Sequence, residues 1–353
     1  MIHWQTYYQQ NKHLPINTIM EGYKRLTLEF TERMMLITQQ SQNVGCGPGG
    51  LDKPAEVVVS IGTQKAIFGY GLDNNFANVS MTNLVSNTGV VATDTTGVGT
   101  ERNALAAAGY GTDKAIFGYG SNMVYFSITN LVSNTGVVAN DVAGVGTERI
   151  ALAAAGYGTD KAIFGYGFSA AIGVVSITNL VSNNGVVTID TTGVGTARNS
   201  LAAAGYGTDK AIFGYGYNGI ANLSITNLVS NTGVVAIDTT GVGTARRVLA
   251  AAGYGTDKAI FGYGAVGFGP ESMTNLVSNT GVVATDTTGV GTARTYPSAA
   301  GYGTDKAIFG YGFDGNNSVS MTNLVSNTGV VATDTTGVGT VRHNLAAAGY
   351  SLS

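Results

Sequence analysis

The chain has 353 residues, of which 44% are hydrophobic and 11% charged, so it is long enough to bury a sizeable core. Its formal net charge of −3 provides no basic surface, which excludes electrostatic capture of DNA or RNA. The single cysteine, Cys46, excludes an internal disulfide framework. No apolar run approaches the roughly 18 residues that span a bilayer, so we expect no membrane insertion.

Residues 17–42 predict an amphipathic helix. Asn17 or Thr18 can cap its first turn, and Pro15 breaks the chain before it. We interpret the helix as an anchoring or oligomerisation segment; the alternative is that it packs against the flank of the following domain. Its apolar stripe, with side chains spaced three or four residues apart, consists of Ile19, Tyr23, Leu26, Phe30, Met34 and Ile37.

Residues 44–50 are rich in glycine and contain a proline, which is typical of a linker. We therefore expect an N-terminal helical segment over residues 1–43, a linker over residues 44–54 and one repeat domain over residues 55–353. Residues 1–10 lack the basic start and apolar core of a signal peptide, so we expect synthesis in the cytoplasm.

The rest of the chain repeats one unit. The heptapeptide Lys-Ala-Ile-Phe-Gly-Tyr-Gly begins at residues 65, 114, 161, 210, 258 and 306, which gives a period of 47 to 49 residues. Units of this length cannot bury an apolar face alone and must stack on their neighbours, and the period is that of a propeller blade.

One unit reads as two hairpins. Residues 105–110 and 114–119 are apolar runs separated by Gly-Thr-Asp, and residues 127–132 and 137–142 flank Ser-Asn-Thr-Gly. The first two segments are apolar on both faces, as a sheet packed between two other sheets requires. We therefore predict an all-β fold, a six-bladed β-propeller of four-stranded antiparallel blades, with a β-solenoid as the alternative.

Two resemblances follow from these repeats. Residues 198–216, Arg-Asn-Ser-Leu-Ala-Ala-Ala-Gly-Tyr-Gly-Thr-Asp-Lys-Ala-Ile-Phe-Gly-Tyr-Gly, resemble a kelch repeat, although Gly-Tyr-Gly stands where kelch has Gly-Gly and the kelch tryptophan is missing. The repeated Thr-Asn-Leu-Val-Ser-Asn-Thr-Gly-Val-Val and Asp-Thr-Thr-Gly-Val-Gly-Thr resemble repeats in virion proteins of tailed bacteriophages. The resemblances imply a kelch-like propeller and a place in a virus particle.

Seven segments compete for six innermost strand positions, because residues 56–61 and 344–350 both match the first strand of a unit. The C-terminal segment keeps the small alanines that suit a crowded axis, so we predict that it inserts beside residues 65–68 and removes two exposed sheet edges. The alternative is a local hairpin from Val57 to Phe68, which closes a shorter loop.

The six copies differ mainly after Gly-Tyr-Gly and after a repeated arginine. Connections alternate between the two faces of an antiparallel blade, so both variable stretches should lie on one face. Loops rich in tyrosine, phenylalanine and asparagine on a rigid scaffold are typical of a recognition surface, although loops also tolerate neutral change. The candidate ligand-binding residues are Asn74, Asn75, Phe76, Asn122, Tyr125, Phe126, Phe168, Tyr217, Asn218, Arg247, Phe268, Tyr296, Phe313, Asn316 and His343.

No catalytic or cofactor motif is present in the sequence. His3, His13 and His343 are too dispersed for a metal site, Gly-x-Gly occurs without a following helix, and no Gly-x-Ser-x-Gly elbow is found. An aspartate and an arginine recur once per unit, which favours a structural role such as an ion pair between blades or a turn hydrogen bond, because a catalytic centre needs asymmetry; the alternative is a metal-binding aspartate near Asp-Thr-Thr-Gly. We expect no metal, no cofactor and no enzymatic activity.

These observations lead to one functional expectation. The chain should be a structural component of a phage particle, such as a tail fibre, baseplate or capsid appendage, that presents its variable face to a host-surface glycan or protein. Residues 1–43 should join it to other virion proteins or to further copies of itself. The alternative is a free bacterial lectin-like propeller that binds carbohydrate.

Overall fold

The computed structural model describes residues 65–350. The predicted helix over residues 17–42, its stripe and the linker over residues 44–54 lie outside the described residues. In the described part, every regular element is a β-strand. No helix there is long and apolar enough to cross a membrane.

Each unit forms one three-stranded antiparallel sheet, with the Lys-Ala-Ile-Phe-Gly strand in the middle. The middle strands are β1 (Lys65–Gly69), β5 (Lys114–Gly118), β8 (Lys161–Gly165), β13 (Lys210–Gly214), β16 (Lys258–Gly262) and β21 (Lys306–Gly310). The inner strands are β4 (Ala106–Tyr110), β7 (Ala153–Tyr157), β12 (Ala202–Tyr206), β15 (Ala250–Tyr254), β20 (Ser298–Tyr302) and β24 (Ala346–Tyr350). The outer strands are β3 (Thr82–Val85), β6 (Thr129–Val132), β11 (Thr178–Val181), β14 (Thr226–Val229), β19 (Thr274–Val277) and β22 (Thr322–Val325).

Two-residue strands lie in the variable loops and beside the repeated arginine. They are β2 (Leu72–Asp73), β9 (Phe168–Ser169), β10 (Gly173–Val174), β17 (Ala265–Val266), β18 (Gly269–Pro270) and β23 (Arg342–His343). They form three small pairs, β9 with β10, β17 with β18, and β2 with β23.

The predicted fold class, a kelch-like propeller of four-stranded blades with an N-terminal helix, is wrong for the described residues, which contain no helix and no four-stranded sheet. The sheets have three strands, and the Val-Val segment that we expected as the fourth makes only isolated bridges such as Val85 with Val91. The physical reason is a change of register: Thr82 is opposite Thr95, whereas Val85 is opposite Val91, so the pairing is not continuous. The side-chain amide of Asn83 donates to the Ala92 carbonyl at 3.0 Å and to the Asp94 carboxylate at 2.9 Å at this point.

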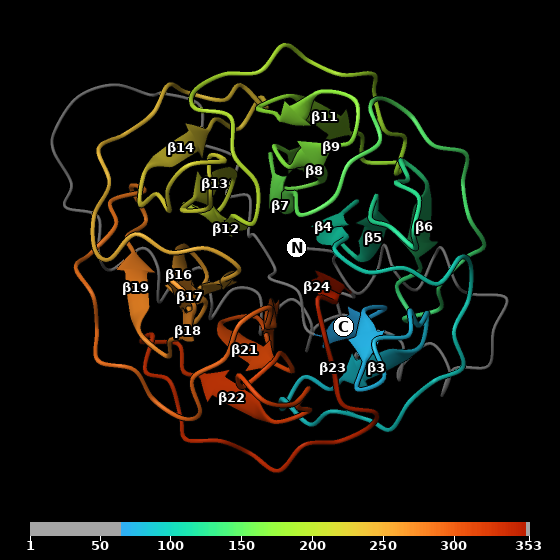
Figure 1. Cartoon of the computed structure of the whole chain (residues 1–353), viewed down its shortest axis with the longest axis vertical. Helices are drawn as coiled ribbons and strands as arrows, with labels where there is room; N and C mark the ends of the chain where they lie inside the picture. The colour runs from blue at the N-terminus through green and yellow to red at the C-terminus, as the bar shows by residue number, and fades with distance from the viewer. Residues whose placement is uncertain (1–64, 351–353) are drawn as a thin grey trace, which may run out of the picture. The chain divides into compact units, whose positions relative to one another are not determined.

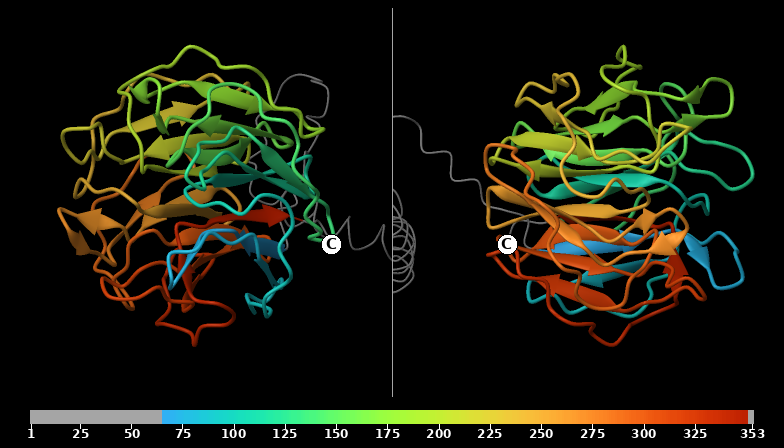
Figure 2. Two further views of the ribbon diagram at one scale, coloured as in Figure 1. Left: turned by 45° about the vertical axis from the view of Figure 1, so that its right-hand side comes forward. Right: turned by 60° about the vertical axis from the view of Figure 1, so that its left-hand side comes forward.

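The six sheets lie around a common axis in chain order (Figure 1). Neighbouring inner strands contact one another in the cyclic sequence β4, β7, β12, β15, β20, β24 and back to β4. Seen from the side, the strands run between two faces that carry the loops (Figure 2).

Strand β24 pairs with β1, as we predicted from its small alanines. The register runs from Lys65 opposite Tyr350 to Gly69 opposite Ala346. Since β3 occupies the other edge of β1, both edges of the first strand are paired and a local hairpin from Val57 has no edge to join. The closing contact therefore joins the two ends of the described chain.

Consecutive sheets interlock through a glycine and a phenylalanine. A Cβ added to Gly165 would lie 2.7 Å from Cζ of Phe213 on the next sheet, so only glycine fits against that ring. The Phe213 ring also meets the edge of Tyr166, with centroids 5.1 Å apart. The same contact recurs at every junction, including the one at which Gly310 of the last sheet faces Phe68 of the first.

A buried arginine crosses each junction. Arg102 stacks over the Tyr70 ring of the first sheet at 4.4 Å. Its guanidinium donates to Asn130 Oδ1 and the Tyr119 carbonyl of the second sheet, both at 2.7 Å, and to the Thr100 carbonyl at 3.0 Å. Arg102 is fully buried, so its charge depends on these partners from two sheets. The equivalent residues are Arg149, Arg198, Arg246, Arg294 and Arg342, all fully buried.

The repeated aspartate completes this network. Asp190 accepts bonds from the Thr147 amide and hydroxyl, which belong to the connection from the preceding sheet, and lies 3.4 Å from Arg149. At the closing junction, Asp94 accepts the same bonds from Thr340 and lies 3.5 Å from Arg342. The ion pair between neighbouring units that we predicted for these residues is found at five of the six junctions, all except the one between Arg198 and Asp238.

A closed circle of backbone hydrogen bonds surrounds the axis near one face. The Ala104 amide donates to the Asn344 carbonyl at 3.0 Å, the Ala151 amide donates to the Ala104 carbonyl at 2.9 Å, and so on around the ring. Each member has a positive φ of 51° to 58°. The six members are Ala104, Ala151, Ser200, Val248, Tyr296 and Asn344.

We predict that Gly165→Ala destabilises the fold. The added methyl group would overlap Phe213 and Thr178 Cγ2, both in a fully packed junction, so we expect a loss of about 1–3 kcal/mol in the free energy of unfolding. Chemical denaturation measures it. Gly269→Ala is the matched control, because its nearest atom, the Val266 carbonyl oxygen, is 3.8 Å from the added Cβ. Equal stability of the two variants would contradict the interlock.

We also predict that acid weakens the junctions. Burial raises the pKa of Asp190, but hydrogen bonds from Thr147 and Asn179 outweigh burial and bring the pKa below its ordinary value of 3.8. A pKa that folding lowers contributes stability above the unfolded value, and this stability is lost as the pH falls through the folded pKa. The melting temperature should therefore drop below about pH 4, and Asp190→Asn should reduce both the melting temperature at pH 7 and the drop in acid.

The control for this prediction is Glu148→Gln, which removes an exposed carboxylate from the connection that carries Thr147. It should leave the melting temperature at pH 7 within experimental error. An acid transition in Asp190→Asn as large as that of the unchanged chain would show that this carboxylate does not hold the junction.

Candidate functional site: the variable-loop face

The two variable stretches of each unit lie side by side on one face. Isolated bridges join the residue after the repeated arginine to the loop after Gly-Tyr-Gly, as in Asn103 with Ser121 and Ile150 with Phe168. Strand β2 meets β23 in the same way, with Leu72 opposite His343. The predicted placement of both stretches on one face is confirmed. We call this surface, residues 72–79, 103–104 and their counterparts, the variable-loop face.

The opposite surface, the uniform face, carries nearly identical turns in every unit. These are the Gly-Thr-Asp turns between inner and middle strands and the Ser-Asn-Thr-Gly turns after the outer strands. The Gly111 amide donates to the Asp160 carbonyl of the next turn at 2.7 Å. The tip of Tyr110 packs against Gly185, where an added Cβ would lie 2.9 Å from the Tyr110 hydroxyl. This packing accounts for the constancy of the turns.

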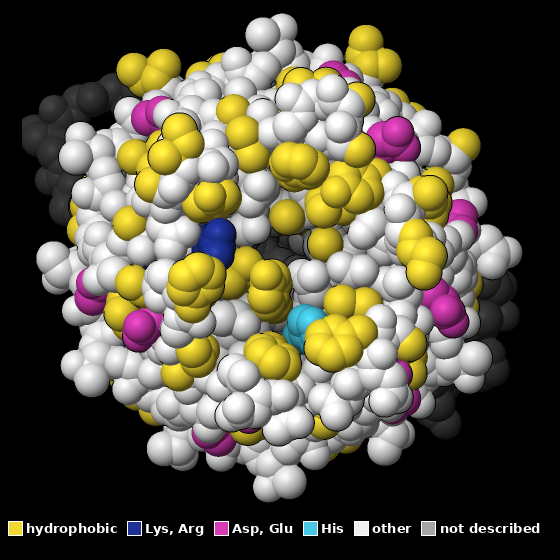
Figure 3. Space-filling view, viewed as in Figure 1, with side chains coloured by type: hydrophobic (Ala, Val, Ile, Leu, Met, Phe, Trp, Pro, Cys, Tyr) yellow, Lys and Arg dark blue, Asp and Glu magenta, His cyan; other side chains and the backbone are white. Residues whose placement is uncertain are grey.

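On the variable-loop face, three aromatic rings surround His343. The centroid of its imidazole lies 5.6 Å from that of Phe313, 5.9 Å from that of Phe76 and 6.0 Å from that of Tyr296. His343 is the one histidine among the described residues, and Figure 3 shows it in cyan among apolar side chains near the axis. We call Phe76, Tyr296, Phe313 and His343 the seam cluster, because they meet where β2 of the first unit pairs with β23 of the last.

A buried serine orients the histidine. The Ser318 hydroxyl lies 2.9 Å from Nδ1 of His343, and the Ser318 amide donates to Oδ1 of Asn74 at 3.2 Å. Burial lowers the pKa of His343 below 6.5, so the imidazole is neutral at pH 7. Two rings of the cluster remain accessible, since Phe76 is 69% and Tyr296 39% exposed.

Two smaller groups of candidate residues also come together. The guanidinium of Arg247 lies 4.8 Å above the ring of Tyr217, and the rings of Tyr125 and Phe168 meet edge to face with centroids 6.3 Å apart. Each pair brings residues from two adjacent units together. A planar cation on an aromatic ring can receive a carboxylate or a stacked ring.

The remaining candidates are separate from the cluster. Phe268 is fully exposed at its loop tip, and Asn218 uses its side-chain oxygen to accept the amides of Ile220 and Ala221. Asn75 and Asn316 donate their backbone amides to carboxylates within their own loops. Asn122 and Phe126 lie in the second unit's loop and are partly buried. The six anchoring residues lie outside the described residues.

Sequence reasoning missed Ser318 and Met123. Ser318 is buried and engages both ends of the seam, but a serine in a polar loop carries no signal of that role. Met123 is fully exposed and has a positive φ of 79°, which presents its thioether at the loop tip. A methionine within a variable loop was the one sequence signal that could have identified it.

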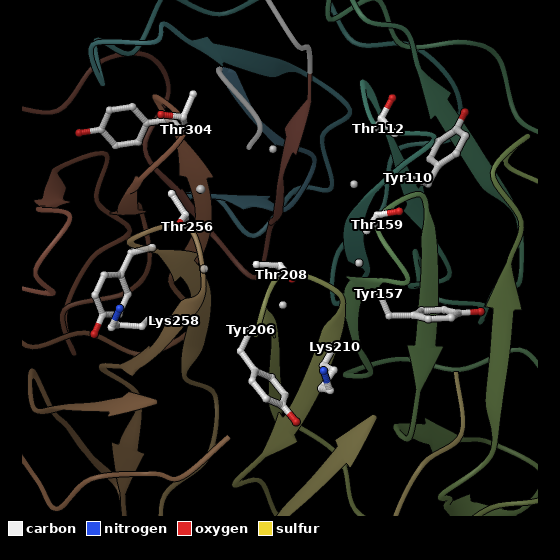
Figure 4. Close-up of a pocket in the computed structure, with 18 of the residues that line it drawn as sticks. Tyr110, Thr112, Tyr157, Thr159, Tyr206, Thr208, Lys210, Thr256, Lys258 and Thr304 are labelled. Atoms are coloured by element: carbon white, nitrogen blue, oxygen red, sulfur yellow. The ribbon is translucent and has the colours of Figure 1, made fainter. Parts of the chain in front are cut away.

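The uniform face also contains a cavity of about 250 Å³ on the axis. Threonines from five turns surround it, among them Thr112 and Thr208 (Figure 4). The lysines in its wall are neutralised, as Lys114 is by Asp113 at 2.6 Å. Among residues 65–350, no group of three or more His, Cys, Asp or Glu side chains could hold a metal ion. The cavity therefore offers hydroxyl groups and balanced charges.

Comparison with known proteins places the chain in no family. No protein-family model matches the sequence, and no curated protein matches it.

We predict that His343 titrates below pH 6.5. Because the surrounding rings and Ser318 bury the imidazole, the midpoint of its NMR titration should lie below the ordinary value, and Phe76→Ala should move it towards 6.5 by admitting water. The stability that the neutral ring contributes is present above pH 6.5 and lost as the pH falls through the lowered pKa. His343→Gln assigns the signal. A midpoint at or above 6.5 in the unchanged chain would contradict the burial of this ring.

Proposed function

We propose that this chain is a non-enzymatic recognition protein of a virus particle, a tail fibre, baseplate or capsid appendage that binds the host surface through its variable-loop face. The observation that carries the proposal is the contrast between the two faces. The scaffold is repeated almost unchanged six times, whereas one face differs in every unit and exposes Phe76, Phe268 and Met123. The repeat resemblance to phage virion proteins supports the same proposal.

The positions of Lys65 and Tyr350, the first and last described residues, agree with this proposal. Lys65 is opposite Tyr350, as Lys114 is opposite Tyr110 beside the turn at Gly111. The described chain therefore begins and ends on the uniform face. Lys65, where the described part begins, therefore lies on the side away from the variable loops.

A free carbohydrate-binding protein is the second candidate, and the seam cluster favours it as much as it favours a virion protein. Aromatic rings beside amides and a neutral imidazole suit a hydroxylated ligand in either setting. The two candidates differ in what they require of residues 1–43. A virion component needs that segment for assembly, and a free lectin does not.

We predict that the triple variant Tyr217→Ala, Phe268→Ala, Phe313→Ala loses cell-surface binding by at least about tenfold, because aromatic side chains dominate the energy of such contacts. Flow cytometry of bacterial strains with the labelled full-length chain measures it. Val330→Ala removes an exposed apolar side chain from the uniform face and is the control. Unchanged binding of the triple variant would exclude this face as the recognition surface.

Deletion of residues 1–50 separates the two candidates. A virion component should lose incorporation into particles while its thermal unfolding transition and its cell binding persist. A free lectin should keep all its activity without this segment.

A further inference from the structure

The seam cluster differs from every other part of the variable-loop face in how its side chains are held. Phe76 comes from the first unit, Tyr296 and Phe313 from the fifth and sixth, and His343 from the last connection. Three rings face one imidazole at 5.6 to 6.0 Å, whereas the other ring contacts on this face involve one pair each. The first and last units must therefore pair before this site forms.

The backbone at Phe76 adopts an unfavourable left-handed conformation. Phe76 has φ = 59°, a left-handed conformation that a bulky residue rarely adopts. The loop holds this conformation because the Phe76 amide donates to the Asp73 carbonyl at 3.1 Å, while the Asp73 carboxylate accepts the amides of Asn75 and Ala77. These bonds hold the ring of Phe76, which is 69% exposed, at the rim of the cluster.

The charges around the cluster indicate what it can bind. Arg342, which precedes His343, is buried in the closing junction. Arg247 stacks on Tyr217, and the carboxylate of Asp314 accepts amides within its own loop. Among the described residues, none of the cation–aromatic contacts involves Phe76, Tyr296 or Phe313, so no cation is stacked on the cluster to pair with a phosphate or a carboxylate. An anionic ligand would therefore be desolvated without a partner.

The polar groups that remain suit hydroxyls. His343 is buried and its Nδ1 is engaged by Ser318, so the polar groups open to a ligand are the exposed side-chain amides of Asn74 and Asn316, in the loops that carry Phe76 and Phe313. Amides both donate and accept hydrogen bonds. A ring with one apolar C–H face to stack on Phe76 or Tyr296, and with hydroxyls at its edge, matches both the rings and the polar rim.

We propose that the seam cluster is the principal binding site of the variable-loop face and that its ligand is an uncharged pyranose unit of a surface polysaccharide. This inference rests on the proposed recognition function and names its ligand class. It has a structural consequence. A sugar that contacts residues of both the first and the last unit binds only the closed ring, so the melting temperature should rise with the sugar concentration.

The test uses the full-length chain and a panel of neutral oligosaccharides, with uronic-acid oligosaccharides and inorganic phosphate as charged probes. Calorimetry or ligand-observed NMR should show binding of at least one neutral member and a raised melting temperature at saturation. Phe76→Ala and Tyr296→Ala should each weaken the dissociation constant at least tenfold, while Tyr296→Phe retains the ring and most of the affinity. Val330→Ala should bind like the unchanged chain, and all variants should be compared for unfolding without sugar.

Each outcome decides the inference. Preference for the charged probes, the absence of neutral binding, or loss on Phe268→Ala with none on Phe76→Ala would overturn it. If cell binding is lost in the triple variant while no sugar binds, a protein receptor is the ligand, the inference fails and the proposed function stands. If the chain binds no cells yet binds a neutral sugar in a Phe76-dependent manner, the seam site stands and the proposed function fails.

Discussion

The fold depends on a guanidinium buried between neighbouring sheets. Arg102 has no contact with solvent, so its charge is compensated only when the ring of Tyr70 in one sheet and the oxygen of Asn130 in the next are both in place. Removing a partner from such a group is far more costly than the group's net contribution to stability. Each sheet is therefore stabilised by packing against a neighbouring sheet. Because Arg342 of the last connection donates to Asn83 of the first unit, the last sheet must pack against the first.

This dependence explains why one face can vary. The junctions are fixed by the arginine, by the aspartate that binds the preceding threonine, and by the fit of Phe213 against Gly165. None of these groups lies in the loops after Gly-Tyr-Gly. Those loops are free to differ without loss of the scaffold, whereas the turns on the uniform face pack against the tyrosines of neighbouring units and remain constant.

Much of the strand arrangement could be predicted from the sequence, and the reasons are local. The heptapeptide period located the middle strands, and the small side chains of Ala346–Ala348 indicated the closing strand correctly. The prediction of a fourth strand failed because the pairing changes register between Thr82 and Val85, and alternation of apolar residues carries no sign of such a change. The seam cluster could be predicted only as separate residues, since no local pattern shows that Phe76 and His343 meet once the ends of the chain pair.

The circle of amides near the axis shows how the scaffold accommodates diversity even at its most crowded point. Left-handed backbone costs roughly 1–2 kcal/mol for a residue with a side chain, yet alanine, serine, valine, tyrosine and asparagine all occupy the six equivalent positions. Glycine is not required there, because each member's amide is held by the carbonyl of its neighbour and the circle has no free end. The hydrogen bonds of the circle, and not the residue type, thus determine this backbone conformation. The side chain at these positions can therefore vary, and at Tyr296 its ring faces His343.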